Sequence, residues 1–247
     1  MPFLAIDAGN SSVKAAVWDG EWSPVARFPS DEASAEEWAE RLESAGRADR
    51  AGIASVVPTL TPRLVEAAAR VVGRAPVVVS VRLGGLPVRV AYATPGTLGA
   101  DRIAAAVAAH ALADGRAVLA IDAGTAITTE VVTADGTYLG GAILPGPDLL
   151  RRALHRDTGQ LPEVPWPETL RPVGDSTVGA IQAGLGVLLA DGIAGLIGRT
   201  ENTLHADSLV VATGGWANWL ARHVAVDRVE PTLVLDGIRL IGESANR

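Results

Sequence analysis

Two short segments combine a carboxylate, a glycine and small polar residues in an order that suits a phosphate- or cation-binding turn. Asp7 precedes Gly9 and, further along, Lys14, whereas Asp122 precedes Gly124 and several threonines. A glycine turn after a strand exposes backbone N–H groups that can hold phosphate oxygens, and the carboxylate can hold a cation directly or through water. A single copy of this pattern would favour the simpler interpretation, a tight β-hairpin with a surface lysine.

The two turns belong to an internal repeat. The hexapeptide Leu-Ala-Ile-Asp-Ala-Gly at 4–9 recurs letter for letter at 119–124, an offset of 119 − 4 = 115 residues in a chain of 247. Small polar residues and a β-branched run follow both copies. This agreement favours a duplication over chance. Two such turns facing one another would place two carboxylates around one polyphosphate, as phosphoryl transfer requires.

Two further segments could complete such a site. Asp101 and Arg102 follow a glycine- and proline-rich loop, where Asp101 could accept a hydroxyl proton and Arg102 could hold a substrate carboxylate. For this pair alone, an acid favourably placed at a helix N-terminus beside a solvated arginine is the better interpretation. Gly214 and Gly215 would let a ring or sugar approach the backbone, although a plain strand-to-helix connection also uses glycines.

The elements that must position these residues alternate between strands and helices. Each repeat predicts a hairpin, because a short buried strand, a glycine turn and a second apolar run follow one another. Ser34 and Glu37 form a capping box before a helix, and Thr61-Pro62 predicts an N-cap and first residue of the next helix, which Gly73 ends. This alternation predicts an α/β fold. The other expected elements are strands at 13–18, 51–57, 76–81, 117–121, 126–132, 138–143 and 209–212, and helices over 101–113 and from Thr177.

Composition excludes several classes of protein. Cysteine is absent, which removes disulfides, thiolate metal sites and cysteine nucleophiles. The net charge is −7 and there is no basic run, so we expect neither nucleic-acid binding nor a polybasic membrane address. The apolar stretch 178–198 contains Gln182 and Asp191, which favours a buried interdomain or dimer-interface helix over a membrane span. The N-terminus lacks the pattern of a signal peptide, which predicts an intracellular protein.

Common catalytic motifs are missing. The sequence contains no G-x-x-x-x-G-K-[ST], no G-x-G-x-x-G, no H-E-x-x-H and no G-x-S-x-G. The four histidines are scattered, which makes a histidine metal cluster an unfavourable interpretation.

Taken in order, these segments resemble the type III pantothenate kinases, members of the acetate/sugar kinase, Hsp70 and actin superfamily. The Gly-Ala-Asp-Arg segment at 99–102 together with both aspartate–glycine turns is highly specific, and the similarity covers almost the whole chain. Two departures are mild: Thr94-Pro95 stands where the family often has Asn-Pro, and the first turn reads Asn-Ser-Ser. The matching segments are 7–11, 53–58, 99–103, 122–126, 140–146, 177–184, 212–215 and 233–238.

The resemblance implies a fold and an activity. It implies two duplicated actin-like (ribonuclease H-like) domains facing a central cleft. Residues 1–115 would contain the first phosphate loop and the Gly-Ala-Asp-Arg segment, and 116–247 the second phosphate loop and an adenosine motif. The implied reaction is ATP-dependent phosphorylation of pantothenate to 4′-phosphopantothenate, the first step of coenzyme A biosynthesis. It also implies magnesium with ATP, a monovalent cation (potassium or ammonium), a homodimer and a cytoplasmic location.

The resemblance also assigns roles to residues. Asp101 resembles the proton acceptor of the family, and Asp122 resembles its monovalent-cation ligand. Thr177 resembles a pantothenate contact that reaches across the dimer. The residues that match ATP contacts are Asp7, Ala8, Gly9, Asn10, Ser11, Ser12, Val13, Lys14, Thr125, Gly214 and Gly215; those that match pantothenate contacts are Tyr92, Gly99, Ala100, Asp101, Arg102 and Thr177.

Two other interpretations remain open from the sequence. The chain could be another small-molecule kinase or a phosphatase of the same superfamily, since each turn alone is shared more widely. It could also be a non-catalytic, regulatory member of the family, although Asp7, Asp101, Arg102 and Asp122 are all present.

Overall fold

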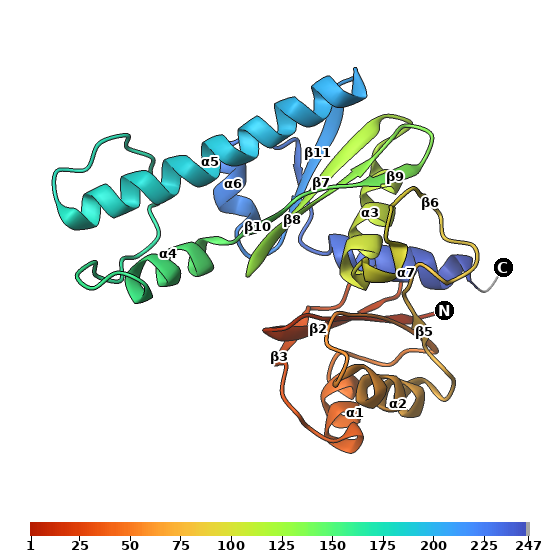
Figure 1. Ribbon diagram of the computed structural model, residues 1–247. Coiled ribbons are helices and arrows are strands. Elements are labelled where there is room, and N and C mark those ends of the chain that lie inside the picture. The colour runs from red at the N-terminus through yellow and green to blue at the C-terminus, as the bar shows by residue number, and fades with distance from the viewer. Residues whose placement is uncertain (246–247) are drawn as a thin grey trace. The chain divides into compact units, whose positions relative to one another are not determined.

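The computed structural model describes residues 1–245, which divide into two compact units (Figure 1). Among the described residues, unit 1 contains 1–112, 136–138 and 232–245, and unit 2 contains 113–135 and 139–231. The chain first passes from unit 1 into unit 2 after residue 112, close to the boundary expected at 115. The expected single unit over 116–247 differs from this division, because the last helix returns to unit 1.

The sheet of unit 1 is built around its first strand. β1 (Phe3–Ala8) is buried at every position and pairs antiparallel with β2 (Ser12–Trp18) on one side and parallel with β4 (Arg50–Ser55) on the other. β3 (Ala26–Pro29) and β5 (Val77–Val78) complete the order β3-β2-β1-β4-β5. Because β1 and β4 run parallel, the end of β1 at Asp7 and the end of β4 at Ser55 reach the same edge of the sheet.

Two pairs of helices cover this sheet, one on each face (Figure 1). α1 (Ala35–Glu43) begins with the expected capping box of Ser34 and Glu37. The N-cap position of α2 (Thr61–Val72) is Leu60, one residue earlier than expected and without a side-chain capping bond, and the helix ends as expected at Gly73, whose φ is +70°. α3 (Ala100–Leu112) and α7 (Leu233–Ser244) pack against each other on the opposite face. The buried residues between α1, α2 and the sheet include Trp38, Leu42, Ile53 and Leu64.

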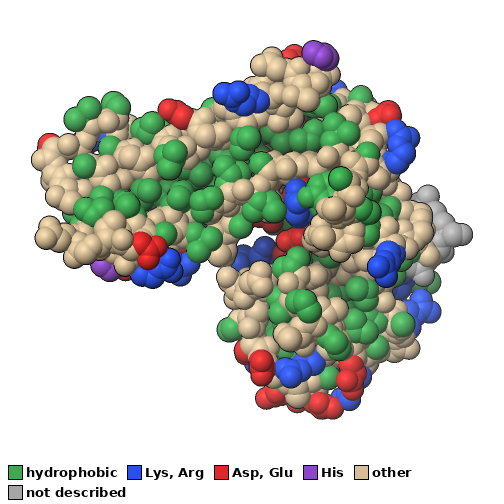
Figure 2. All heavy atoms as spheres, in the orientation of Figure 1, with side chains coloured by type: hydrophobic (Ala, Val, Ile, Leu, Met, Phe, Trp, Pro, Cys, Tyr) green, Lys and Arg blue, Asp and Glu red, His purple; other side chains and the backbone are tan. Residues whose placement is uncertain are grey.

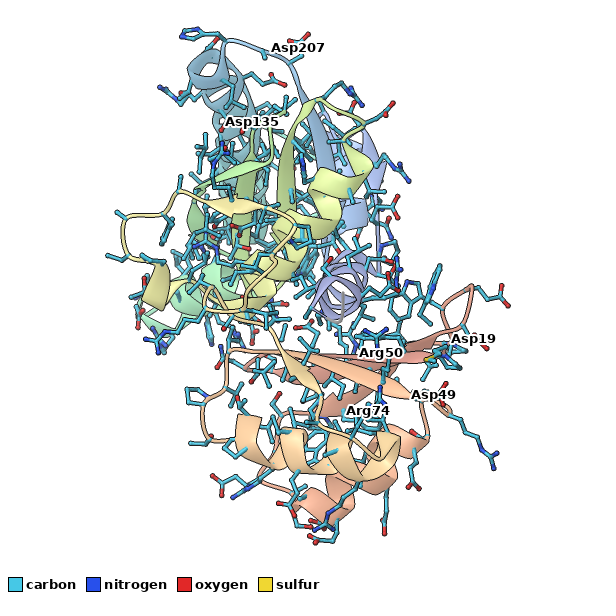
Figure 3. The ribbon with its side chains drawn as sticks, turned by 90° about the vertical axis from the view of Figure 1, so that its right-hand side faces the viewer. Asp19, Asp49, Arg50, Arg74, Asp135 and Asp207 are labelled. Carbon is cyan, nitrogen blue, oxygen red and sulfur yellow. The ribbon has the colours of Figure 1, made fainter. Side chains whose placement is uncertain are left out.

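Glycines let α7 approach its neighbours closely. A Cβ atom on Gly237 would lie 1.8 Å from the Ala104 carbonyl oxygen of α3, and one on Gly242 would lie 2.5 Å from the ring of Phe3. Arg50, labelled in Figure 3, donates from Nη2 to the Gly242 carbonyl (2.5 Å). These contacts fix α7 in unit 1. We did not predict this helix, since its glycines lower intrinsic helix propensity and tertiary packing supplies its stability.

Unit 2 repeats the same arrangement of strands. β7 (Ala117–Ala123) pairs antiparallel with β8 (Ala126–Val132) and parallel with β11 (Ser208–Thr213), which pairs parallel with β12 (Arg228–Val229). β10 (Ile143–Pro145) pairs with β8 on its other side. Both units thus contain a hairpin whose first strand also pairs, on its other side, with a parallel strand: β1 with β4 in unit 1 and β7 with β11 in unit 2. The duplication predicted from the hexapeptide is therefore confirmed at the level of topology.

The helices of unit 2 are α4 (Pro147–Arg156), α5 (Thr177–Leu204) and α6 (Ala217–His223). α4 was not predicted, because Gly146 and Pro147 look like a turn; here Pro147 occupies the start of the helix, where no backbone N–H is needed. α5 begins at Thr177 as expected and buries Ile181, Leu185 and Ile193 in the unit 2 core.

α5 is long and apolar enough to cross a membrane if judged by length and composition alone, a test that core helices also pass. One side of α5 is buried, while Leu188 is 61% exposed on the other. Hydrophobic side chains are visible along this part of unit 2 in Figure 2.

Two strands are shorter than the sequence predicted. The strand expected over 76–81 contains only Val77–Val78, so residues 79–81 leave the sheet beyond its edge. The strand expected over 138–143 is split into β9 (Thr137–Gly140) and β10. The first residues of β9 pair in unit 1 with β6 (Arg89–Val90), and a 3₁₀ turn at Pro95–Thr97 precedes α3.

Candidate active site

The first turn connects β1 to β2 and places a lysine beside a carboxylate. The Gly9 N–H donates to the Ser12 carbonyl (3.1 Å), and the Ser30 hydroxyl donates to the Gly9 carbonyl (2.5 Å). Asp7 lies opposite Lys14 in the hairpin register, and Lys14 Nζ is 3.2 Å from Asp7 Oδ2. Asp7 is only 7% exposed, so the pair holds a buried carboxylate next to a half-buried ammonium group. The exposed residues at the tip are Asn10 and Ser11.

Asp101 lies in the first turn of α3, within the same unit. The Arg102 N–H donates to Asp101 Oδ1 (2.7 Å). Burial raises the pKa of the Asp101 carboxyl above its ordinary value of 3.8, and the charge of Asp7 raises it further. The Arg102 hydrogen bond and charge act in the opposite direction without overcoming burial. A carboxylate with a raised pKa is better suited to accepting a proton than an ordinary surface aspartate.

Gly99 leaves room for this carboxylate. A Cβ atom on Gly99 would lie 2.5 Å from Asp101 Oδ1 and 3.4 Å from Val56 Cγ1. Any larger residue at this position would displace the Asp101 side chain or the backbone. The Gly-Ala-Asp-Arg segment therefore needs its glycine for space.

Arg102 is buried, with 7% of its surface exposed. Its guanidinium carbon lies 6.0 Å from the centre of the Tyr92 ring, and the Tyr92 ring is 6.1 Å from that of Tyr138. An arginine over an aromatic face gains cation–π attraction and holds the ring in place. The predicted substrate contacts Tyr92, Asp101 and Arg102 are thus brought together in unit 1, and the charge of Asp7 acts on the same carboxylate.

A cavity of about 350 Å³ lies beside this group in unit 1. Ser55 and Val56 at the end of β4, the segment 79–82 after β5 and the segment 95–100 before and at the start of α3 contribute its lining. Ser55, Val56 and residues 79–82 were not among the predicted site residues. The available signal was their position directly after predicted strands, since ligands of α/β sheets bind outside the carboxyl ends of parallel strands.

The second turn connects β7 to β8 in unit 2. The Gly124 N–H donates to the Ala126 carbonyl (3.0 Å), two residues further on, whereas the Gly9 N–H of the first turn reaches the Ser12 carbonyl, three residues further on, so the second turn is the shorter one. Asp122 lies opposite Thr128, at the register position where the first hairpin has Lys14. The aspartate and glycine are therefore repeated, but the length of the turn and the lysine are not.

Gly214 lies against the second turn. A Cβ atom on Gly214 would be 2.5 Å from Asp122 Oδ1 and 2.6 Å from the Ala123 carbonyl oxygen. The φ of Gly214 is +89°, a conformation that other residues rarely adopt. Gly214 thus packs directly against the Asp122 carboxylate and the Ala123 carbonyl, a contact that only glycine permits. The cation role expected for Asp122 stays a prediction.

Three other predicted site residues of unit 2, Thr125, Gly215 and Thr177, are exposed. Thr125 is exposed in the second turn, where Gly146 approaches so closely that its Cβ would lie 2.6 Å from the Thr125 carbonyl oxygen. Gly215 is exposed between β11 and α6, as expected for an approach to the backbone. Thr177 is exposed at the first position of α5, next to the cap Ser176.

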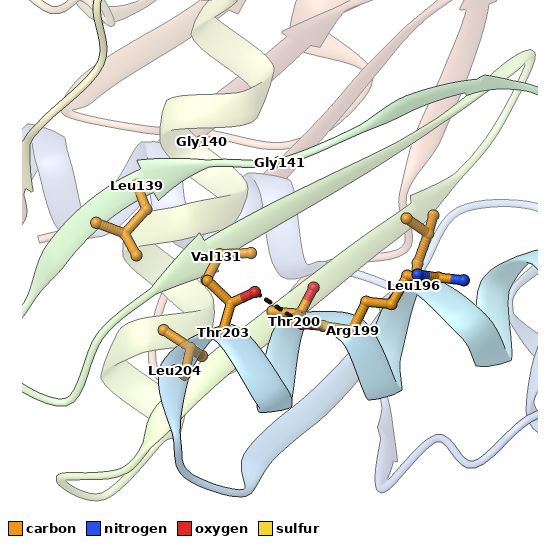
Figure 4. Close-up of a pocket in the computed structure, with 9 residues that line it drawn as sticks. All are labelled: Val131, Leu139, Gly140, Gly141, Leu196, Arg199, Thr200, Thr203 and Leu204. Atoms are coloured by element: carbon orange, nitrogen blue, oxygen red, sulfur yellow. Dashed lines mark hydrogen bonds between the residues drawn. The ribbon is translucent and has the colours of Figure 1, made fainter.

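A second, apolar pocket of about 250 Å³ lies in unit 2 between the end of α5 and strands β8 and β9 (Figure 4). Leu139, Leu196 and Leu204 contribute to its lining, and none of the predicted site residues does. Among residues 1–245, no group of three or more His, Cys, Asp or Glu side chains could hold a metal ion on its own.

Solved structures place the fold in a known class. A candidate Baf-family transcriptional activator from Campylobacter jejuni matches with a TM-score of 0.66 at 21% identity, covering 99% of this chain and 100% of the other. A ROK hexokinase from Thermus thermophilus matches with a TM-score of 0.53 at 17% identity, covering 100% of both chains. At these identities the likeness concerns the fold alone. The chain has the duplicated α/β fold of ROK sugar kinases and actin-like ATPases, which confirms the expected fold class.

Sequence relatives narrow this class to one family. The type III pantothenate kinase family matches residues 3–199. The type III pantothenate kinase of Moorella thermoacetica is 34% identical over 252 residues, covering 97% of this chain and 98% of the relative. The chain belongs to the type III pantothenate kinase family, and the resemblance found in the sequence is confirmed.

Proposed function

We propose that this protein transfers the γ-phosphoryl group of ATP to the primary hydroxyl of pantothenate, forming 4′-phosphopantothenate in the first step of coenzyme A biosynthesis. Membership of the type III pantothenate kinase family supports the reaction and its substrates. The observation that carries the chemical assignment is Asp101, a largely buried carboxylate whose pKa is raised by burial and by Asp7 of the first turn.

In the proposed reaction, Asp101 orients the pantothenate hydroxyl and takes its proton. A bond forms between that hydroxyl oxygen and the γ-phosphorus, while the bond from the γ-phosphorus to the oxygen bridging to the β-phosphate breaks. ADP leaves with the electron pair of that bond, and the proton moves to the Asp101 carboxylate. The transition state of phosphoryl transfer is loose, so a late proton transfer to a carboxylate is sufficient. Tyr92, Gly99, Ala100 and Arg102 form the surrounding pantothenate contacts.

The first turn binds the phosphates of ATP in this proposal. The turn residues Asp7 to Lys14 offer backbone N–H groups and the single lysine of the chain. Lys14 is a point charge suited to phosphate oxygens, and its pairing with Asp7 keeps it in position before ATP binds. Magnesium bound to ATP offsets phosphate charge, and the hard carboxylate oxygens of Asp7 suit that ion.

The second turn binds the monovalent cation in this proposal. Asp122, whose carboxylate lies near the end of β7, holds a potassium or ammonium ion here, since carboxylate oxygens suit hard cations. The cation offsets negative charge on the nucleotide, in a chain whose own net charge is −7. Thr125 contacts ATP, and Gly214 with Gly215 lies along the adenosine.

We further propose a cytoplasmic homodimer in which α5 forms the interface. Leu188 is 61% exposed on α5, and Gly184, Gly192 and Gly195 leave open space around their Cα atoms, which permits close approach of another helix. Thr177 is exposed at the start of this helix, available to a partner's substrate. Leu188→Arg should therefore shift the protein to monomers in analytical ultracentrifugation and raise the KM for pantothenate. A variant that stays dimeric would contradict this interface.

A coupled assay of ADP release tests the proposed reaction. With ATP, magnesium and potassium, turnover should require pantothenate and should not occur with a panel of hexoses. Turnover of a hexose instead would favour a sugar kinase of the same fold. The absence of ATP consumption with pantothenate would favour the non-catalytic, regulatory interpretation.

A further inference from the structure

A serine that follows β3 holds the first turn from the outside. The Ser30 hydroxyl donates to the Gly9 carbonyl oxygen (2.5 Å), across 21 positions of the sequence. β3 brings Ser30 to this place, because its last residue, Pro29, lies opposite Ser12 in the register with β2. The Asp31 N–H donates to the Pro29 carbonyl (3.0 Å), which closes a three-residue turn with Ser30 at its centre. The Ser30 side chain therefore reaches the first turn from a defined backbone.

The segment that begins at Ser30 and connects β3 to α1 is fastened to two helices. Arg41 of α1 donates to both carboxylate oxygens of Asp31 (2.8 and 3.1 Å). Arg63 of α2 donates to the Glu32 carbonyl (2.7 Å). Each bond at an exposed site contributes little alone, but together they restrict a short segment. The Ser30 hydroxyl thus acts on the first turn from a firm support.

The bond to Ser30 fixes the direction of the peptide group between Gly9 and Asn10. This peptide group is trans, as are the others in the described chain, so its C=O and N–H point in opposite directions. Because Ser30 holds the Gly9 carbonyl, the Asn10 N–H points away from Ser30. Asn10 is exposed, and among residues 1–245 no group accepts a hydrogen bond from its N–H. This N–H is therefore available to a bound anion.

We propose that Ser30 is a positioning residue for ATP: its hydroxyl holds the Gly9 carbonyl away from the phosphates, so that the Asn10 N–H faces them. The inference rests on the proposed function, in which the first turn binds the phosphates of ATP. Backbone N–H groups of such a turn bind anions. Without the bond to Ser30, rotation of the same peptide group would bring its carbonyl oxygen towards the phosphates, and the two negative partners would repel each other.

Ser30→Ala tests this assignment. We expect its KM for ATP to rise by roughly 3- to 10-fold, as for the loss of one hydrogen bond. The kcat should change little, because binding of this kind is equal in the ground and transition states. The KM for pantothenate should be unchanged, since the role of Ser30 concerns the nucleotide alone. Ser30→Thr keeps the hydroxyl and should restore the KM for ATP.

Ser44→Ala is the matched control. The exposed Ser44 hydroxyl donates to the Arg41 carbonyl at the end of α1 (2.6 Å), so this variant also removes a serine-to-carbonyl bond of unit 1. Both alanine variants should unfold at a slightly lower temperature, whereas only Ser30→Ala should raise the KM for ATP. A KM for ATP in Ser30→Ala within about twofold of wild type would overturn the proposal, as would an equal rise in Ser44→Ala.

Adenosine, which lacks phosphates, separates a phosphate effect from a general loss of fit. Its inhibition constant should be equal for the wild-type enzyme and Ser30→Ala, and equal weakening of adenosine and ATP would contradict the proposal. If the wild-type enzyme does not phosphorylate pantothenate, the proposed function fails instead. Calorimetric titration of both proteins with ATP and magnesium then still decides the role of Ser30: tighter binding to the wild type supports it, and equal binding overturns it.

Discussion

The two hairpin turns share a hexapeptide and differ in the residue that faces the aspartate. In the first hairpin Asp7 lies opposite Lys14, and the two side chains form an ion pair of 3.2 Å. In the second, Asp122 lies opposite Thr128, and Gly214 approaches the carboxylate so closely that no side chain fits between them. Directly opposite residues of a hairpin project to the same face, so these pairs are equivalent places in the two units.

This difference indicates how a duplicated site can become asymmetric. The first turn contains its own cation, which makes it suitable for phosphate oxygens. The second turn contains oxygen ligands and no lysine, which makes it suitable for a cation from solution. We propose that the residue opposite the aspartate, lysine in one hairpin and threonine in the other, gives the two turns opposite ligand preferences.

The largest effect is expected at Asp101, whose pKa is raised by burial and by the charge of Asp7 in the first turn. Asp101→Asn should lower kcat by roughly 10²–10⁴, the usual loss when a general base is removed. The affinity for ATP should be retained, because the change leaves the turn intact. Stopped-time ADP assays and nucleotide-binding titrations measure the two quantities. Asp49→Asn, the same chemical change at an exposed site of unit 1, is the control, and near-normal turnover in Asp101→Asn would remove this residue from the role.

The second largest effect on activity is expected from a change at Lys14. Lys14→Met should lower kcat/KM for ATP by about 10- to 150-fold, which corresponds to a charge-assisted hydrogen bond of about 1.5–3 kcal/mol. Lys14→Arg keeps the charge and should recover most of this loss. Steady-state kinetics with varied ATP measure the effect. If Lys14→Met leaves kcat/KM for ATP unchanged, the first turn does not use its lysine for phosphate.

A smaller effect is expected in the second turn. Gly214→Ala places a Cβ 2.5 Å from Asp122 Oδ1 and strains a backbone with φ of +89°. Displacing this carboxylate should raise the potassium concentration that gives half-maximal activity by about tenfold, or about 1.4 kcal/mol. Gly115→Ala is the matched control, because Gly115 has a φ of +77° and open space where its Cβ would lie. Equal potassium requirements in both variants would argue against a cation ligand at Asp122.

The smallest effect concerns stability and pH. Burial and Asp7 raise the pKa of Asp101, so the folded state binds a proton there more readily than the unfolded state. The contribution of Asp101 to the free energy of unfolding is therefore most favourable below pH 3.8, the ordinary pKa of an aspartate. This contribution is lost as the pH rises through the raised pKa of the folded state. Asp101→Asn should thus unfold at a slightly higher temperature than wild type near pH 7, and the difference should shrink towards pH 4. Calorimetric scans at both pH values measure it, and a lower unfolding temperature at pH 7 would contradict the assigned direction.

The repeated parts of the molecule were the most predictable. A hexapeptide, a glycine turn and an apolar strand are local signals, so both hairpins and the α/β class followed from the sequence. The placement of α7 did not, because its return to unit 1 depends on Gly237 meeting Ala104 across the unit, a contact between residues more than 100 positions apart.

The chemistry of the candidate site was only partly predictable. The sequence indicated Asp7, Asp101 and Asp122 as carboxylates of interest. It gave no sign that Arg102 is buried or that Arg82 lines a cavity, since burial and exposure depend on how loops fold around the ends of β4 and β5. Local motifs indicated the carboxylates, whereas the side chains that line the cavity lie partly in loops without a motif.

A potassium titration tests the asymmetry of the two turns most directly. Initial rates of pantothenate-dependent ADP release would be measured for wild type, for Thr128→Lys and for Ala206→Lys, which adds a lysine at an exposed site of unit 2. We expect wild type and Ala206→Lys to need potassium and to be poorly active in sodium alone. We expect Thr128→Lys, whose added ammonium group lies opposite Asp122, to be active without potassium. Wild-type activity in sodium equal to that in potassium would contradict the account.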